Sequence, residues 1–178
     1  MHRIVATVTS LEQHLRLVAH NPDRYRPPVC PHCGVGKPWR HGCYHRKADR
    51  SPRSSAARNL VPVPRFRCHA CEQTCSRLPA CMAPRRWYDW GVQQIVLLCL
   101  AGGDSLHAAA RYGKVARHTA RRWRDWLAQR GEQFAFFLRS RFPDWGRVGD
   151  TAAFWHASLA ERSLPELMAW LDRDLIVP

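Results

Sequence analysis

Two Cys-x-x-Cys pairs constrain the fold of this chain more than any other feature. The first pair, Cys-Pro-His-Cys, spans residues 30–33, and the second, Cys-His-Ala-Cys, spans residues 68–71. Two thiolates separated by two residues bind one metal ion from a tight turn, and two such turns complete a tetrahedral site. The sequence therefore predicts a Zn²⁺ site whose ligands are Cys30, Cys33, Cys68 and Cys71.

The interval between the pairs leaves two alternatives open. It is longer than in compact zinc fingers, so a nearby side chain could replace one cysteine ligand; the candidates are His41, Cys43, His45 and His69. A chance spacing or a disulfide is the other alternative. Three further cysteines have no such partner and are expected to be small buried apolar residues: Cys75, Cys81 and Cys99.

Charge indicates the class of partner. Among 178 residues, 28 are Lys or Arg and 14 are Asp or Glu, which gives a net charge of +14. All but three of the basic residues are Arg, which binds phosphate and guanine edges in a bidentate manner. Nucleic acid is therefore the expected partner, ahead of an anionic membrane surface. No apolar run of membrane-spanning length and no secretory leader is found, so we expect a cytoplasmic, nucleoid-associated protein without a membrane partner.

The positive charge is concentrated between the cysteine pairs. Residues 34–67 contain nine Lys or Arg and a single acid, Asp49. This pattern predicts a β ribbon that binds phosphate, while a solvated loop is the alternative. Residues 49–58 resemble a hairpin tip, and residues 60–67 a strand whose prolines favour a sheet edge. The predicted DNA contacts of the ribbon are Lys37, Arg40, Arg46, Lys47, Arg65 and Arg67.

The segment before the first pair is expected to pack on this ribbon. Residues 3–8 are typical of a strand, and Ser10 followed by Gln13 forms a capping box for a helix to about Ala19. The side chains predicted to face inward are Leu11, Leu15 and Val18.

The segment after the second pair predicts a helix-turn-helix. Pro84 opens a helix over about 85–100 with Trp87, Ile95 and Leu98 on its apolar face, and Ser105 caps a short helix over 106–112. A turn at Gly113 leads to an Arg-rich helix over 115–127, which is the predicted recognition helix. Its predicted base contacts are His118, Arg121 and Arg122, and the predicted phosphate contacts are Arg117, Arg124, Arg85 and Arg86. A merely solvated basic face is the alternative.

The last part of the chain is net acidic and helical. The Arg-rich helix is expected to continue through Phe137, and Asp150 and Ser163 cap two further helices. These helices would cover the core or dock a partner. The fold class is therefore α+β and mainly α, with an N-terminal segment (1–29), a four-cysteine β zinc ribbon (30–82), a helix-turn-helix domain (83–130) and a C-terminal helical hairpin (131–178).

Catalytic patterns are missing from the sequence. The acids Asp89, Asp104, Asp125, Asp144 and Asp150 are scattered, and no phosphate-binding loop or metalloprotease pair occurs. A zinc ion held by four thiolates also has no open coordination position. We therefore expect a protein that is not an enzyme.

The order of these motifs resembles a known bacterial module. Cys-Pro-x-Cys-Gly, a basic ribbon, Arg-Phe-Arg-Cys-x-x-Cys-x-x-Thr and a Pro-led helix-turn-helix are similar to the DNA-binding module of insertion-sequence and transposon-encoded proteins. The resemblance covers residues 30 to about 127, with departures at Gly113 and at Ala116, where Ser is common. Cys75 also stands where the ribbon often has an aromatic residue.

The resemblance implies the biological setting. It implies an accessory transposition factor or a regulator of a mobile element, with double-stranded DNA as its partner and a transposase or recombinase as a second partner. A homodimer is left open. The main alternative is a protein–protein adaptor, and single-stranded RNA binding comes third because no aromatic platform is evident in the sequence.

Overall fold

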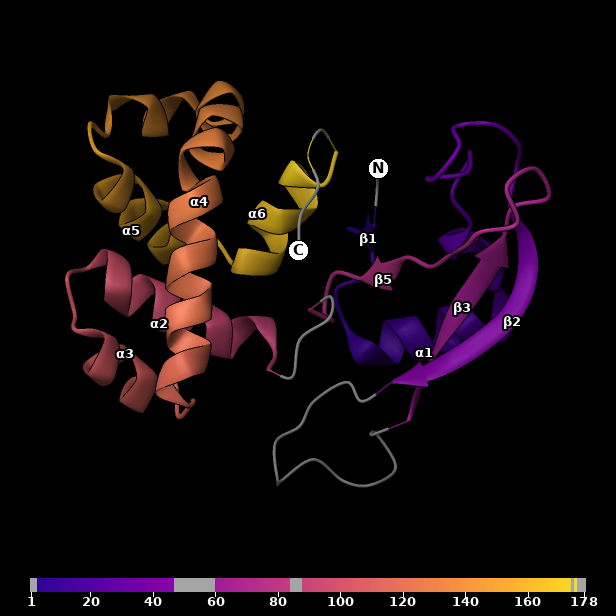
Figure 1. Ribbon diagram of the computed structural model, residues 1–178, viewed down its shortest axis with the longest axis horizontal. Coiled ribbons are helices and arrows are strands. Elements are labelled where there is room, and N and C mark those ends of the chain that lie inside the picture. The colour runs from indigo at the N-terminus through magenta and orange to yellow at the C-terminus, as the bar shows by residue number, and fades with distance from the viewer. Residues whose placement is uncertain (1–2, 47–59, 84–87, 174, 176–178) are drawn as a thin grey trace. The chain divides into compact units, whose positions relative to one another are not determined.

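The computed structural model describes residues 3–46, 60–83, 88–173 and 175 (Figure 1). The fold is α+β and mainly helical, as predicted. The chain forms two compact units, which we call unit 1 (residues 1–89 and 172–178) and unit 2 (residues 90–171). No helix within the described ranges has both the length and the apolarity needed to cross a membrane. The predicted hairpin tip at 49–58 lies outside the described residues.

The described residues of unit 1 form two small sheets and one α-helix. Strand β1 (Ile4–Val5) pairs in parallel with β5 (Leu78–Pro79). The second sheet is antiparallel with the order β2-β3-β4. Its strands are β2 (Trp39–Arg46), β3 (Val61–Arg67) and β4 (Thr74–Cys75), and β2 curves along β3 in Figure 1. Helix α1 (Leu11–His20) and the 3-10 helix η1 (Pro22–Tyr25) precede these strands. The segment before the first cysteine pair is thus part of unit 1.

Helix α1 begins as predicted but buries a different face. The Ser10 hydroxyl accepts a hydrogen bond from the Gln13 amide, while the Gln13 side chain accepts one from Thr9 N. The prediction that Leu15 faces inward is wrong, because this side chain is 40% exposed. His14 is buried instead. Its Nε2 donates to Pro62 O (2.9 Å), and the Tyr25 hydroxyl therefore donates to Nδ1 (2.6 Å). Two hydrogen bonds compensate for burying this polar ring.

Strand β3 contains two prolines and nevertheless lies at the centre of its sheet. It pairs with β2 from Val61 to Arg67, with a register shift between Arg40 and Cys43 that leaves Arg65 without a direct partner, whereas β4 reaches only Phe66 and Arg67. The edge-strand prediction is therefore wrong for the C-terminal end of β3. The Pro62 carbonyl accepts from α1, so the nitrogens of Pro62 and Pro64 also point away from β2. Neither proline interrupts the ladder between β2 and β3.

The C-terminal end of the described chain returns to unit 1. Asp172 is buried, and its carboxylate accepts a hydrogen bond from Ile4 N at 2.8 Å. Arg77 donates to Ile4 O at 3.3 Å, and the neighbouring Asp172 charge partly offsets the lowering of the Arg77 pKa by burial. These contacts tie β1 to residues far away in sequence and stabilise the β1–β5 pair.

Unit 2 is entirely helical. Its α-helices are α2 (Trp90–Ala101), α3 (Leu106–Tyr112), α4 (Arg117–Arg141), α5 (Thr151–Glu161) and α6 (Leu164–Leu171), with the 3-10 helix η3 (Pro143–Arg147) after α4. Each of α2, α3 and α4 contacts the other two. The Ser105 hydroxyl accepts from Ala108 N, and the Asp150 carboxylate accepts from Ala153 N, so these two predicted caps are confirmed, while the cap at Ser163 stays a prediction.

Helix α2 differs from its prediction. It begins at Trp90 rather than near residue 85, and the predicted inward residue Ile95 is 47% exposed. Trp87 lies outside the described residues. The buried positions of α2 are Trp90, Gln93, Val96 and Leu97. Because α2 is apolar on most of its circumference, hydrophobicity alone does not identify its inner face.

The long helix α4 crosses the expected domain boundary between residues 130 and 131. Its second half carries Phe134 and Leu138, which are buried, whereas Phe136 is 69% exposed. The Gln94 side chain joins α2 to the C-terminal helices. It donates to Leu159 O (2.7 Å) and accepts from Leu164 N (2.7 Å), and so satisfies backbone groups at the end of α5 and the start of α6.

Candidate metal centre and nucleic-acid surface

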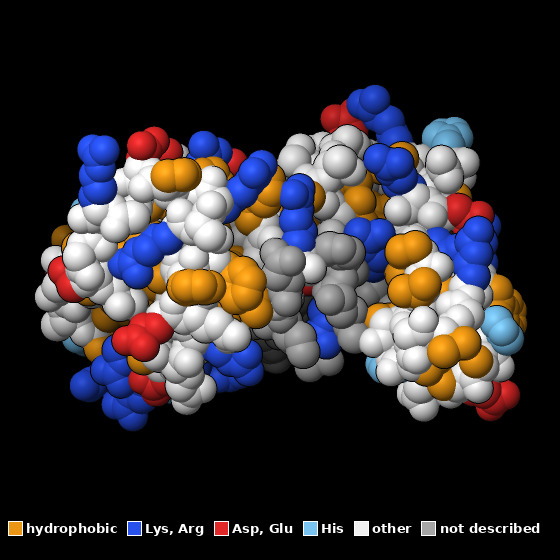
Figure 2. Space-filling model, turned by 90° about the horizontal axis from the view of Figure 1, so that it is seen from above, with side chains coloured by type: hydrophobic (Ala, Val, Ile, Leu, Met, Phe, Trp, Pro, Cys, Tyr) orange, Lys and Arg blue, Asp and Glu red, His pale blue; other side chains and the backbone are white. Residues whose placement is uncertain are grey.

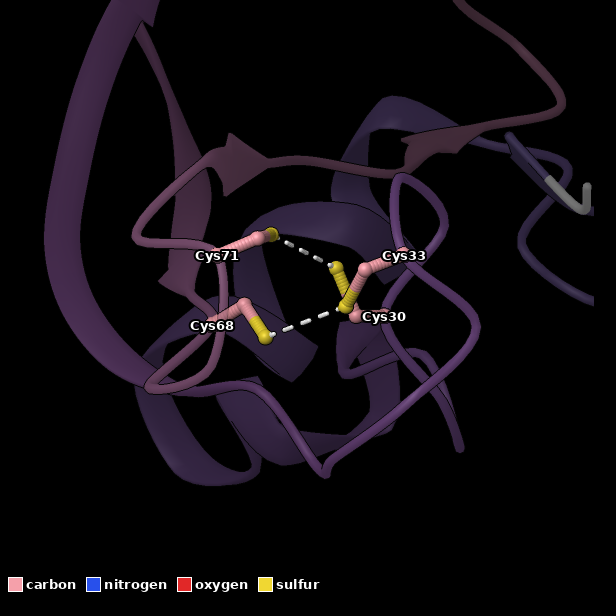
Figure 3. A group of neighbouring side chains, drawn as sticks. All are labelled: Cys30, Cys33, Cys68 and Cys71. Carbon is pink, nitrogen blue, oxygen red and sulfur yellow. Dashed lines mark hydrogen bonds between the residues drawn. The ribbon is translucent and has the colours of Figure 1, made fainter.

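The four predicted cysteine ligands come together in unit 1. The sulfur atoms of Cys30 and Cys71 lie 3.6 Å apart, those of Cys33 and Cys68 lie 3.7 Å apart, and all four lie within 4.8 Å of one another. Figure 3 shows the four side chains pointing from two loops toward a common centre. A tetrahedral ion with Zn–S bonds of about 2.3 Å requires sulfur atoms roughly 3.8 Å apart. The cluster therefore has the size of a four-thiolate metal site.

The two loops of this cluster have the same backbone geometry. His32 N donates to the Cys30 sulfur at 3.4 Å, and Ala70 N donates to the Cys68 sulfur at 3.4 Å. The residue after the second cysteine of each pair is left-handed, Gly34 with φ 69° and Glu72 with φ 57°. Amides directed at sulfur stabilise thiolates, so both turns are suited to metal ligands. Only the first turn has glycine at its left-handed position.

His69 connects the two loops without acting as a ligand. A side chain added at Gly36 (φ 76°) would lie 2.8 Å from His69 Cε1, so the His69 ring lies directly on Gly36. Gly36 O accepts from Cys30 N at 3.0 Å. The ring of the second loop thus packs on the first loop beside the metal site.

The thiols influence each other's protonation. The amide of Cys33 is the main cause that lowers the pKa of the Cys30 thiol to about 6. The amide of Gln73 acts in the same direction on Cys71, but desolvation and the three neighbouring sulfurs raise the Cys71 pKa to about 12. Like charges at this separation oppose one another, so a cation at the centre is needed to hold four thiolates together.

The predicted alternatives to this ligand set are not supported by the geometry. Among the described residues, the four cysteines are the group of His, Cys, Asp and Glu side chains that could hold a metal ion. All eight cysteines are free, and sulfur separations of 3.6 and 3.7 Å exceed the 2.05 Å of a disulfide. Burial raises the pKa values of the remaining partly buried thiols, Cys75, Cys81 and Cys99.

The predicted phosphate contacts of unit 1 differ in their availability. Lys37 and Arg40 are exposed. Arg46 donates to Ala83 O at 2.8 Å, and burial lowers its pKa. Arg67 pairs with Glu72 at 3.1 Å, and Arg65 lies over the Tyr44 ring at 5.3 Å. Lys47 falls outside the described residues. Within the described part, Arg67 is thus the ribbon residue paired with an acid, Arg46 is half-buried against a backbone carbonyl, and Lys37, Arg40 and Arg65 are the remaining predicted contacts.

The predicted recognition residues lie together on the first half of α4. Five of them are exposed: Arg117, His118, Arg121, Arg122 and Arg124. Ala120 and Trp123 are buried, so helical geometry directs His118, Arg121 and Arg122 away from the helix packing. Arg124 donates to Asp125 at 2.8 and 3.0 Å. Arg85 and Arg86 lie outside the described residues.

The turn before α4 has two irregular features. Lys114 adopts φ 50°, while the adjacent Gly113 has φ −75°. Gly113 is required for space, because an added Cβ would lie 2.3 Å from Val96 Cγ2. Ala116 occupies the N-cap of α4 in an extended conformation, and its methyl side chain provides no cap.

Trp39 is the surface residue that the sequence analysis missed. It lies at the start of β2, is 48% exposed and meets the His41 ring edge-on with centroids 5.4 Å apart. Its proximity in sequence to Lys37 and Arg40 was the available signal. An aromatic residue in a strand is usually buried, however, and only the structure shows that this one is not.

One family model matches this chain. The model is described as a domain of unknown function (DUF6431), and it matches residues 30–123. The matched segment runs from the first cysteine of the four-cysteine cluster to Trp123 in α4. No curated protein and no solved structure gives a significant match.

Proposed function

The chain belongs to the DUF6431 family, and we propose that it is a zinc-stabilised, non-enzymatic protein that binds double-stranded DNA. The proposal joins the two features found in the matched segment, the four-cysteine cluster and the exposed Arg face of α4. The observation that carries it is the position of that face at the start of a long helix whose opposite side is packed on α2 and α3.

Zinc would act as a structural cross-link. Cys30 and Cys33 would hold it from one loop, and Cys68 and Cys71 from the other. Four thiolates leave no coordination position for water or substrate, so the ion would stabilise the loops on either side of β2 and β3 rather than take part in a reaction.

Helix α4 has the properties of a groove-binding helix. A short helix, α3, and a tight turn precede α4, and the exposed first residues of α4 can approach a duplex. This order supports a helix-turn-helix. Arg121 and Arg122 have the donor geometry to read guanine edges, while Arg117 beside the helix N-terminus is suited to phosphate.

The mobile-element setting is supported by the resemblance of the motif order from residue 30 to about 127. In this setting the protein would be an accessory factor for a transposase or recombinase, or a regulator. A second function, a protein–protein adaptor, is favoured by one observation. Phe136 is 69% exposed on α4 and contacts Phe137 edge-on with centroids 5.7 Å apart, and both follow the DNA-facing half of the helix.

Electrophoretic mobility shift and footprinting on the DNA flanking the protein's own coding region test the proposal. The double variant Arg121→Ala, Arg122→Ala should lose sequence-specific protection and reduce the salt slope of duplex binding by about two. A matched control removes the same charge from α1 and η1 through Arg16→Ala and Arg24→Ala, both exposed in unit 1.

Two results would separate the proposals. Loss of protection in the α4 variant alone supports DNA recognition by this helix. Equal effects of both double variants, or protection that survives in the α4 variant, would refute it. A Phe136→Ser variant that binds DNA normally but no longer associates with a transposase or recombinase that the wild type binds would favour the adaptor.

A further inference from the structure

We propose that unit 1 carries a second nucleic-acid surface, which binds single-stranded nucleic acid by stacking an unpaired base on Trp39. The proposal rests on a different unit and a different chemistry from duplex recognition by α4. It goes beyond the proposed function by naming a further class of nucleic acid that the protein would bind.

The surface is defined by strand register, and we call it the aromatic face: Trp39, Tyr44, Arg65 and Arg67. Trp39 is the direct cross-strand partner of Arg67, so both side chains project from the same side of the sheet. Arg65 lies two residues before Arg67 on β3 and therefore shares that side. The Arg65 guanidinium covers the Tyr44 ring at 5.3 Å, which fixes its charge in place.

Exposure of Trp39 makes the indole available. Its side chain is 48% exposed, whereas Phe66 on the neighbouring strand is fully buried in the core. Phe66 packs against Val5, Val8 and Tyr25, which closes the opposite side of the sheet there. On the side of Trp39, Val63 is buried as well, so the open part of this side lies at the Trp39 end of β2. The flat indole at the start of β2 thus remains open to a planar ligand.

The positive charge around the aromatic face favours a nucleic acid as this ligand. The described stretches 34–46 and 60–67 contain five basic residues and no acid: Lys37, Arg40, Arg46, Arg65 and Arg67. Glu72, which follows these stretches, pairs with Arg67. Figure 2 shows Lys and Arg side chains next to hydrophobic ones on the visible face of the molecule. A phosphate chain with accessible bases complements both properties at once.

The aromatic face favours an unpaired base over a duplex. Inside a duplex the bases stack on each other, and their flat faces are not accessible. A base at a strand end, in a bulge or in an opened duplex can stack on an indole while Lys37 and Arg65 hold the neighbouring phosphates. Stacking of this kind contributes about 1–3 kcal/mol per base and depends little on sequence.

Fluorescence anisotropy with labelled oligonucleotides tests the inference on the full, zinc-loaded chain. The probes are a thymine 12-mer, the same 12-mer with abasic sites in place of its central bases, and a duplex of equal length. Trp39→Ala should weaken binding of the thymine 12-mer by about 5- to 150-fold, the range that corresponds to loss of one stacked base. Trp39→Phe should retain most of the affinity, because phenylalanine also has a flat face.

The abasic probe separates stacking from phosphate binding. Wild-type protein should bind it as weakly as Trp39→Ala binds the thymine 12-mer, and Trp39→Ala should bind both single strands equally. Duplex binding should change less than twofold. Equal zinc content and unfolding temperature in wild type and variant would show that the fold is retained.

The outcomes distinguish this inference from the proposed function. Arg121→Ala with Arg122→Ala should lose duplex binding and keep single-strand binding. If wild type fails to bind the thymine 12-mer, or if Trp39→Ala binds it as tightly as wild type, the inference is wrong while duplex recognition can still hold. If Trp39→Ala weakens duplex and single strand equally, the aromatic face is a general phosphate contact and base stacking is refuted.

Discussion

Replacing Gly113 by alanine should disturb the packing that positions α4. The added Cβ would lie 2.3 Å from Val96 Cγ2, and Val96 is fully buried. The clash is steric and not conformational, because Gly113 has φ −75°, which alanine adopts without strain. Overpacking a core by one methyl group usually costs about 1–3 kcal/mol. A contact this short with a buried side chain indicates the upper half of that range.

Thermal unfolding followed by the helical circular dichroism signal measures this effect. Unit 2 spans 82 residues, so each kcal/mol should lower the unfolding temperature by about 4–8 °C. Gly113→Ala should therefore unfold roughly 8–24 °C lower than wild type for a cost of about 2–3 kcal/mol. Gly146→Ala is the matched control, because nothing lies within 4 Å of its added Cβ, and it should change the unfolding temperature little.

A double-mutant cycle identifies the cause. Val96→Ala alone leaves a cavity and should cost about 1–3 kcal/mol. In the double variant the new methyl group at position 113 occupies part of that cavity. The double variant should thus be less destabilised than the sum of the single variants by about 1–3 kcal/mol. Additive effects, or a Gly113→Ala variant as stable as the Gly146→Ala control, would refute the packing argument.

Four further predictions concern the metal site, two backbone positions and one buried histidine. Chelation of zinc or Cys30→Ser should unfold unit 1 and leave the helical signal of unit 2, and loss of both signals together would contradict independent units. Glu72→Gly should remove the backbone strain of a left-handed non-glycine residue, which costs about 1–2 kcal/mol, and should therefore tighten zinc binding in a chelator competition. Glu72→Ala keeps this strain and should not tighten zinc binding. Ala116→Ser should add a cap at the start of α4 and raise stability by about 1 kcal/mol in urea unfolding, whereas Ala116→Val should not. Burial lowers the pKa of His14 below 6.5 in the folded state. The contribution of the neutral ring to the free energy of unfolding is therefore complete above pH 6.5 and is lost as the pH falls from 6.5 through the folded-state pKa. At matched zinc saturation, wild type should lose more stability between pH 7 and pH 5 than His14→Gln.

The caps and the two cysteine pairs follow from short stretches of sequence. Ser10, Ser105 and Asp150 each satisfy a backbone amide three residues ahead, and this geometry needs no other part of the chain. The spacing of the cysteine pairs likewise defines two local turns. Local chemistry was therefore sufficient to predict the helix starts at these caps and the four-cysteine cluster.

Burial was less predictable because it depends on what packs against each element. His14 replaces Leu15 in the interior because Tyr25 and Pro62 supply hydrogen-bond partners from elsewhere in unit 1. Ile95 is exposed because α2 is apolar on most sides, and its neighbours select the inner face. Neither outcome can be read from periodicity along a single segment.

Sequence by itself determined the α+β class, the two cysteine pairs and the basic Arg positions, because composition, the spacing within each pair and the helix caps are local properties of the chain. Tertiary structure decided which charges remain available. In the folded chain Arg46 donates a hydrogen bond to Ala83 O, Arg67 forms an ion pair with Glu72, and Trp39 remains exposed on the sheet. The physical reason is that the availability of a side chain depends on partners far away in sequence, and folding alone brings them into contact.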